Sequence, residues 1–166
     1  SREGVLDTVA ELVEYATDHG LWVEVLGEDG SRADLNFLEE LAETAHEAGA
    51  DRFCYADTVG HATPDRTVAA VSRLAAHGPT STHTHDDLGL GVANALASVA
   101  AGADLVHATV NGIGERAGNV ALEEVAIALQ HGYDVATVDS ERLYELGRLV
   151  ADATGVNLPP NKAVLG

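Results

Sequence analysis

Apolar positions along the chain follow two alternating patterns. The three- and four-residue spacing of amphipathic helices occurs over residues 5–16, 37–48, 68–75, 88–101, 120–129 and 141–153. Between these segments lie four short runs that favour strands: LWVEVL (21–26), RFCYA (52–56), TSTHTH (80–85) and LVHATV (105–110). The pattern therefore predicts a chain in which helices and strands alternate.

Capping residues mark where several of these helices begin and end. Asp34 and Ser140 are expected N-caps, and Thr63 followed by Pro64 is typical of a cap and a first helical turn. Gly20 and residue 49, also a glycine, stand where the first two helices are expected to stop.

The predicted strands begin at residues 21, 52, 80 and 105, so successive starts lie 31, 28 and 25 residues apart. Right-handed β-α-β crossovers need spacings of this kind, and they produce a parallel sheet. Four such units predict an α/β fold, either a small doubly wound sheet or half of an eight-stranded barrel. No strand end carries the phosphate loop of a Rossmann or P-loop domain.

Polar side chains gather just after the carboxyl end of every predicted strand. They are Glu28 and Asp29, Asp57 and Thr58, residues 83–87, and residues 111–119. Because parallel strands all end at one edge of a sheet, these side chains are expected to share a rim, where α/β folds usually carry their chemistry.

Composition narrows the class of protein. The chain has 166 residues, enough for one domain with a core, and 46% of them are hydrophobic. It has no apolar run long enough for a membrane span and no signal-peptide pattern. The single cysteine, Cys54, excludes a disulfide framework and is expected to be a small core residue. We expect a cytoplasmic protein.

Acidic residues outnumber basic ones by 27 to 9, and the formal net charge is −18. This charge would repel nucleic acids and anionic membranes, so neither is expected as a partner. An acidic interaction surface is one explanation. Because the acids are scattered over several helices, we favour a surface adapted to high salt and expect a halophilic source.

His83 and His85 lie two residues apart on a predicted strand, so their side chains project from the same face. Two neutral imidazoles held in this way can chelate a metal ion, and Asp87 is aligned with them if the strand continues. An isolated pair of this kind is more often structural. Its position on the polar rim, beside acidic residues, favours metal binding here.

The loop NGIGERAGN (111–119) follows the last predicted strand. Its three glycines permit positive φ, Glu115 and Arg116 carry charges, and Asn119 lies at an expected helix start. A tight turn that ends in an asparagine N-cap is the structural alternative, and Asn119 is able to serve in both roles.

HTHDDLG (83–89) and NGIGERAGN together resemble the 2-isopropylmalate, homocitrate and citramalate synthases, a group of TIM-barrel metalloenzymes. The resemblance extends more distantly to hydroxymethylglutaryl-CoA lyase. GEDGSR (27–32), DTVGHATP (57–64) and PNKAVLG (160–166) match the same group in the same order, so the resemblance covers nearly the whole chain.

The resemblance implies that His83 and His85 bind a divalent metal ion (Mn²⁺, Mg²⁺ or Zn²⁺), with Asn119 as a further ligand or as a neighbour bridged by water. It also implies a 2-oxoacid pocket that is lined by Glu28, Thr58 and Glu115, with Glu115 as the catalytic residue of this chain. Where the group usually has side chains, the sequence has Gly27 and Gly30, and a looser loop around Glu28 is expected.

Two parts of the family pattern are missing from this sequence. The family's first strand carries an Arg-Asp pair, in which the aspartate binds the metal and the arginine polarises the substrate, and no such strand precedes Ser1. A further catalytic histidine follows the point where this chain ends. We therefore expect strands five to eight of a TIM barrel over residues 1–137, then a trailing helix and the start of a linker to a missing subdomain over 138–166. Such a half is expected to be inactive alone.

The implied reaction is an aldol-type condensation of acetyl-CoA with a 2-oxoacid, followed by thioester hydrolysis. A metal ion chelated by the keto and carboxylate oxygens would activate the carbonyl, whereas the base that deprotonates acetyl-CoA is expected outside this chain. DTVGHATP favours 2-isopropylmalate synthase, an acyltransferase of leucine biosynthesis that uses 2-oxoisovalerate. Homocitrate and citramalate synthase are the alternatives. The full-length enzyme is expected to be a homodimer.

Two functions of other classes stay open. One is a non-catalytic acidic metal-binding module that has kept the rim of an enzyme. The other is a metal-dependent hydrolase that uses His83, His85 and Asp87 unaided. The remaining histidines are given no role, although His61 and His107 lie near the rim.

Overall fold

A computed structural model describes residues 1–166. Helices and strands alternate from end to end, as the apolar pattern predicts. In chain order the elements are α1 (Arg2–Asp18), β1 (Glu24–Gly27), η1 (Gly30–Arg32), α2 (Leu35–Glu47), β2 (Arg52–Asp57), α3 (Pro64–Leu74), β3 (Thr80–Thr84), α4 (Gly91–Ala100), β4 (Leu105–His107), η2 (Val110–Gly112), α5 (Leu122–Tyr133), η3 (Ser140–Arg142) and α6 (Leu143–Thr154), where η denotes a short 3-10 helix.

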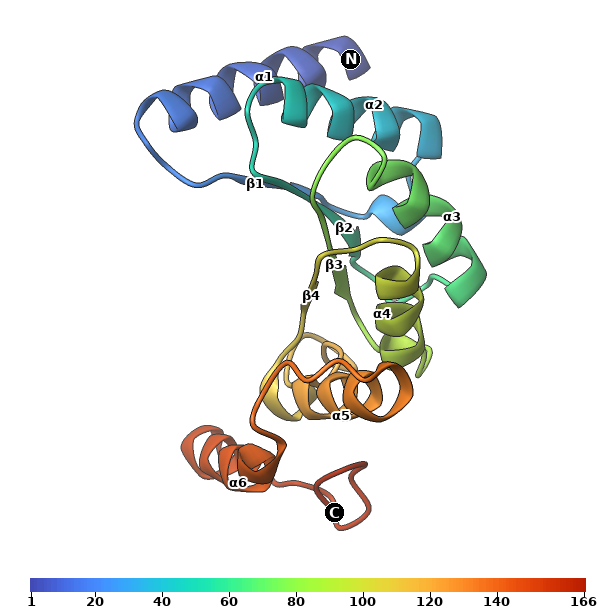
Figure 1. Cartoon of the computed structure of the whole chain (residues 1–166), viewed down its shortest axis with the longest axis vertical. Coiled ribbons are helices and arrows are strands. Elements are labelled where there is room, and N and C mark those ends of the chain that lie inside the picture. The colour runs from blue at the N-terminus through green and yellow to red at the C-terminus, as the bar shows by residue number, and fades with distance from the viewer.

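The four strands form one parallel sheet in the order β1-β2-β3-β4. The helices α1 to α4 lie along one side of the curved sheet, and its concave side is bare (Figure 1). Strands that follow one another in order, with all crossovers on one face, are typical of a barrel, because a doubly wound sheet carries helices on both faces. The α/β prediction is confirmed, and the architecture is half of a TIM barrel.

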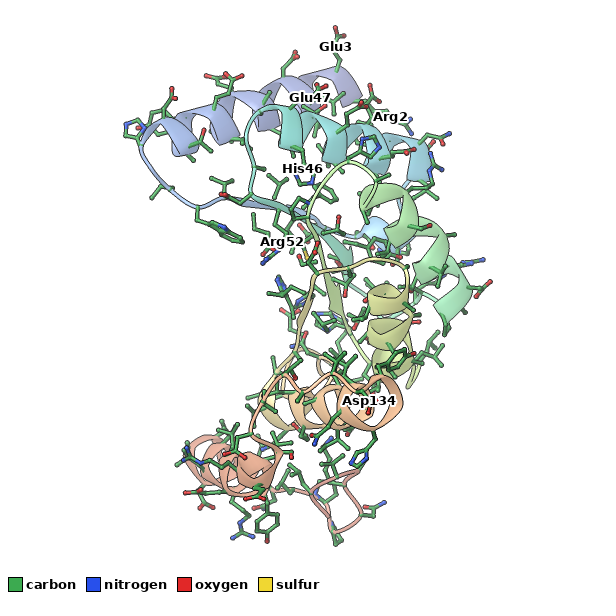
Figure 2. All side chains as sticks on the ribbon, viewed as in Figure 1. Arg2, Glu3, His46, Glu47, Arg52 and Asp134 are labelled. Atoms are coloured by element: carbon green, nitrogen blue, oxygen red, sulfur yellow. The ribbon has the colours of Figure 1, made fainter.

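Strand alternation decides which side chains face the bare side of the sheet. Phe53 and Tyr55 of β2 pack under the helices, so Cys54 between them and Arg52 before them point the other way. Arg52 is seen on the concave side in Figure 2. On β3, Thr82 is hydrogen-bonded to Ser98 of α4 at 2.9 Å, which leaves the odd-numbered residues of that strand on the bare side.

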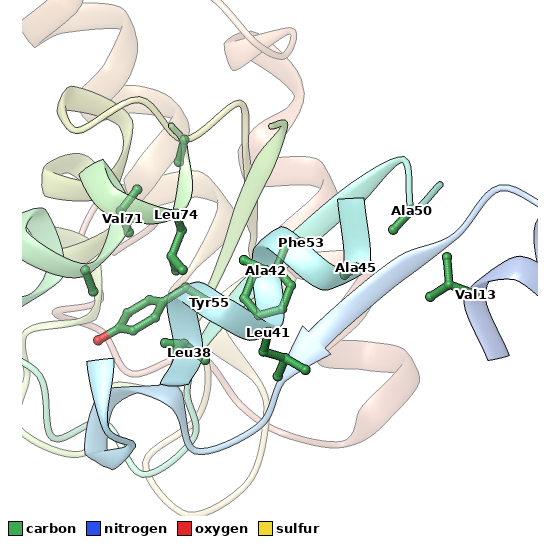
Figure 3. Packing of buried hydrophobic residues seen from close by; sticks show 12 residues of the cluster. Val13, Leu38, Leu41, Ala42, Ala45, Ala50, Phe53, Tyr55, Val71 and Leu74 are labelled. Atoms are coloured by element: carbon green, nitrogen blue, oxygen red, sulfur yellow. The ribbon is translucent and has the colours of Figure 1, made fainter. Parts of the chain in front are cut away.

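The main core lies between the sheet and the helices α1, α2 and α3 (Figure 3). Phe53 is in its centre, with Leu38 and Leu41 of α2 on one side and Val71 and Leu74 of α3 on the other. Burying each of these side chains contributes about 1.5–3 kcal/mol. A smaller cluster around Val120 and residue 95, an alanine, joins α4 to α5.

Several element boundaries differ from the sequence prediction for local reasons. β1 begins at Glu24 rather than at residue 21, because pairing with β2 starts there. α4 begins at Gly91 rather than at residue 88, because the carboxylate of Asp86 accepts the N–H of Gly91 at 2.7 Å and holds the intervening residues in a turn. Asp34 is the N-cap of α2, as predicted. Ser140 is not an N-cap, since Asp139 takes that position before η3.

None of the helices combines the length and the apolar composition that crossing a membrane requires.

Candidate metal centre

His83 and His85 point toward each other on the bare side of β3. Their Nε2 atoms are 3.3 Å apart, and the two rings meet edge to face. Two ligands at the usual Zn–N distance and a tetrahedral angle are separated by about 3.3 Å, so the pair already has the spacing of two ligands of one cation.

The burial of the two histidines favours binding of a cation. His85 is only 4% exposed, and His83 is half-buried. Burial lowers the pKa of His83, and the neighbouring His85 and His107 lower it further. His83 is therefore neutral at neutral pH, with a lone pair available for a metal ion.

Asn119 lies beside His85 because the chain after β4 returns to the end of β3. The two residues form an isolated antiparallel bridge, and the N–H of Val120 donates to the carbonyl oxygen of Thr84 at 3.0 Å. The amide of Asn119 donates to the carbonyl oxygen of Ile113 at 3.1 Å, which leaves its Oδ1 buried and without a partner.

An unpartnered buried oxygen is costly unless something binds it. Asn119 is not the N-cap of α5, since Ala121 holds that position, so the structural alternative for this residue does not apply. Nδ1 of His85 is likewise buried without a partner. A cation bound to the imidazoles and to the amide oxygen of Asn119 fits this set of donors.

Asp87 is not aligned with the histidines. It lies beyond the end of β3, and both of its carboxylate oxygens accept hydrogen bonds from Arg116, at 2.8 and 2.9 Å. This bond is the main reason why the pKa of Asp87 is lowered. The hydrolase alternative, which uses Asp87 as a ligand, therefore has no support from this arrangement.

The three residues expected around a 2-oxoacid lie on the same rim in different settings. Glu28 is exposed at the end of β1, and the hydroxyl of Thr58 accepts the N–H of Asp29 at 2.8 Å. The side chain of Glu115 is 80% exposed, and its Oε2 lies 4.0 Å from Nε2 of His85. Glu115 is thus the rim carboxylate that approaches the histidine pair.

The loop around Glu28 is not loose, contrary to the expectation from its two glycines. Gly27 is buried so closely against Leu38 and Phe53 that an added Cβ would lie 2.8 and 3.0 Å from their side chains. Gly30 is buried as well. The glycines let the loop pack directly on the core.

One polar contact on the bare face was not predicted from the sequence. Glu24 and His107 meet across the sheet, with Oε2 and Nε2 3.2 Å apart. The signal was present in LWVEVL, where a single acid occupies an inward-facing position of an otherwise apolar strand.

Among solved structures, the fold is similar to that of a hydroxymethylglutaryl-CoA lyase from Pseudomonas aeruginosa. The TM-score is 0.80 at 23% sequence identity, and the match covers 98% of this chain and 59% of that one. At this identity the likeness concerns the fold.

Three curated relatives are much closer in sequence, and each spans all of this chain. A Methanothermobacter thermautotrophicus protein named as an (R)-citramalate synthase is 52% identical over 168 residues. Two Methanopyrus kandleri proteins, named as a homocitrate synthase and a 2-isopropylmalate synthase, are 51% and 49% identical over 169 residues. The chain spans 34%, 43% and 34% of these three proteins, respectively.

The family pattern called HMGL-like matches residues 1–150, which include all four strands and the histidine pair. The chain belongs to the HMGL-like family.

Proposed function

We propose that the protein containing this chain condenses acetyl-CoA with a 2-oxoacid at a divalent metal ion held by His83, His85 and Asn119. The observation that carries the proposal is the 3.3 Å approach of the two Nε2 atoms beside a buried, unpartnered Asn119 oxygen. The activity is a property of a longer protein, since the chain spans about a third of two of the compared synthases.

A divalent ion held by His83, His85 and Asn119 would supply Lewis-acid polarisation of the ketone of the 2-oxoacid. The residues of this chain set the conditions for that chemistry. Burial keeps His83 neutral, and the hydrogen bonds of Arg116 hold the loop that carries Glu115 and Asn119. Glu115, exposed beside His85, is placed to hold a proton at a substrate oxygen.

The 2-oxoacid proposed is 2-oxoisovalerate, which would make the protein a 2-isopropylmalate synthase and an acyltransferase of leucine biosynthesis. Support comes from the segment DTVGHATP, whose Thr58 lies on the rim. Pyruvate, which would give citramalate, and 2-oxoglutarate, which would give homocitrate, are the competing substrates, because relatives named for all three products have nearly equal identity.

A chimera tests the proposal. The homologous third of the Methanothermobacter thermautotrophicus protein is replaced by residues 1–166, and CoA release is followed with acetyl-CoA and each of the three 2-oxoacids. We expect metal-dependent turnover that is fastest with 2-oxoisovalerate. His83→Ala and His85→Ala should each lower turnover by more than about 100-fold, since even outer partners of metal ligands change affinity or activity by 10–100-fold.

His131→Ala is the matched control, because that histidine is exposed on α5 and should leave turnover unchanged. A folded chimera that binds metal through His83 but releases no CoA would favour the metal-binding module instead. Faster turnover with pyruvate or 2-oxoglutarate would keep the class of reaction and overturn the proposed substrate.

A further inference from the structure

A second group of potential ligands lies on the bare face of the sheet. Glu24 of β1, Cys54 of β2 and His107 of β4 each offer one ligand atom, and these atoms all lie within 4.8 Å of one another. His107 joins the other two, with Nε2 at 3.2 Å from the Glu24 carboxylate and Nδ1 at 4.0 Å from Sγ of Cys54.

The order thiol, imidazole, carboxylate is also that of a nucleophilic triad, and the surroundings of Cys54 exclude this role. Cys54 has no exposed surface, and burial raises the pKa of its thiol to about 12, with the charge of Glu24 acting in the same direction. A reactive cysteine needs an accessible thiolate with a lowered pKa. Cys54 lacks both properties.

Burial disfavours a thiolate at position 54, and a bound metal ion would stabilise this charged form. Thiolate, imidazole and carboxylate are the three side-chain ligands of zinc, with bonds of about 2.0–2.3 Å. Ligand atoms around such an ion are about 3.3–3.8 Å apart, so the present spacing closes with side-chain shifts of about 1 Å. One nitrogen of His107 would bind the ion, and the side chains of Glu24 and Cys54 would turn toward the same ion.

We propose that Glu24, Cys54 and His107 form a second metal site, for a thiophilic divalent cation such as Zn²⁺. None of the three is among the proposed ligands of the rim site, although the ring of His107 lies edge to face with that of His83 at 5.7 Å. The carboxylate of Glu24 also accepts a hydrogen bond from Ser81 at 2.5 Å and lies 3.9 Å from Arg52. Both contacts involve Oε1, so Oε2, which faces His107, is the atom available to the metal ion, and Ser81 keeps the carboxylate oriented.

Co²⁺ is the probe for this site, because a Co²⁺–thiolate bond gives a strong near-ultraviolet charge-transfer band that nitrogen and oxygen ligands do not give. Cys54 is the only cysteine, so the band reports on this residue alone. The 166-residue chain is titrated with Co²⁺ in a phosphine reductant. We expect the band to appear as Co²⁺ is added and to disappear when Zn²⁺ is added.

Variants at four positions locate the site. Cys54→Ser should abolish the band, and Glu24→Gln and His107→Gln should each weaken Co²⁺ binding at Cys54 by at least about tenfold. His83→Ala should keep the band, and Mn²⁺ binding at the histidine pair should persist in Cys54→Ser. Far-ultraviolet circular dichroism verifies that each variant is folded, and Cys54→Ala provides a second cysteine-free variant.

The proposal of a second metal site is wrong if the wild-type chain shows no band at saturating Co²⁺. It is also wrong if Glu24→Gln and His107→Gln both bind Co²⁺ at Cys54 with unchanged affinity. Loss of the band in folded His83→Ala would place Cys54 in the histidine centre and would also overturn a separate site. Failure of the proposed condensation is a different result, since it is measured as CoA release and depends on His83 and His85.

Discussion

Arg116 holds Asp87 through two parallel hydrogen bonds, from Nε at 2.8 Å and from Nη2 at 2.9 Å, although 29 residues separate them. The same guanidinium donates to the carbonyl oxygen of Thr58 at 2.7 Å. One side chain thus joins the loops that follow β2, β3 and β4. Arg116 does so from a left-handed backbone conformation, with φ 58°, which is strained for a residue with a side chain.

Arg116→Ala should weaken Mn²⁺ or Zn²⁺ binding at the histidine pair by roughly tenfold, because the loop that carries Asn119 loses its attachment to the neighbouring loops. Arg116→Lys should recover little, since an ammonium cannot make the two parallel bonds. Calorimetric titration measures both. Arg142→Ala is the control, an exposed arginine that pairs only with Glu145 on α6. Equal affinity in all four proteins would show that the Arg116–Asp87 contact has no role in the site.

Lys162 is the only lysine, and it ties the C-terminal segment to α5. Its Nζ lies 3.3 Å from the buried carboxylate of Glu123, which also accepts the N–H of Asn111 at 3.0 Å. Lys162→Met should destabilise the fold by about 1–3 kcal/mol, less than a fully buried pair because Lys162 is partly exposed. Denaturant unfolding measures this loss.

Lys162→Arg, which keeps the charge, should be milder than Lys162→Met. Adding Glu123→Gln to Lys162→Met should restore part of the lost stability, because it removes the uncompensated buried charge. A double variant less stable than Lys162→Met would contradict this account of the pair.

The lowered pKa of Asp34 predicts that the stability of the fold depends on pH. Backbone hydrogen bonds from Phe37 and Asn36, with a side-chain bond from Arg2, lower the pKa of Asp34 in the folded chain. Its contribution is therefore present above its unfolded pKa of about 3.9 and is lost as the pH falls through the lower folded value. Asp34→Ala should lower the thermal midpoint at pH 7 by about 2–4 °C.

The difference between Asp34→Ala and wild type should shrink when the midpoints are measured near pH 3. Asp7→Ala, in the exposed part of α1, is the control and should change the midpoint little at either pH. A difference of the same size at both pH values would show that the charge of Asp34 is not what stabilises the cap.

The net charge of −18 predicts that salt stabilises the chain. Raising KCl from 0.1 M to 1 M shortens the screening length from about 10 Å to 3 Å, which removes most of the repulsion between scattered surface acids. The thermal midpoint should rise over this range, as scanning calorimetry can measure. A flat or falling midpoint would count against adaptation to high salt.

The sequence by itself determined the order of the elements and the fold class. Apolar spacing, capping residues and crossover length are local properties, and they predicted four β-α units, the N-cap at Asp34 and the parallel sheet that the structure has. Strand alternation also placed His83 and His85 on one face, because neighbouring positions of a strand point in opposite directions.

Tertiary structure decided which distant residues meet. The pairing of Arg116 with Asp87, the unpartnered oxygen of Asn119 and the contact of Glu24 with His107 depend on sheet curvature and on the return of the 111–119 loop to β3. The local periodicity of the sequence encodes neither the sheet curvature nor the loop path, because both arise only when all four strands pack together. Local periodicity therefore sets the elements, and packing sets the distances on which chemistry depends.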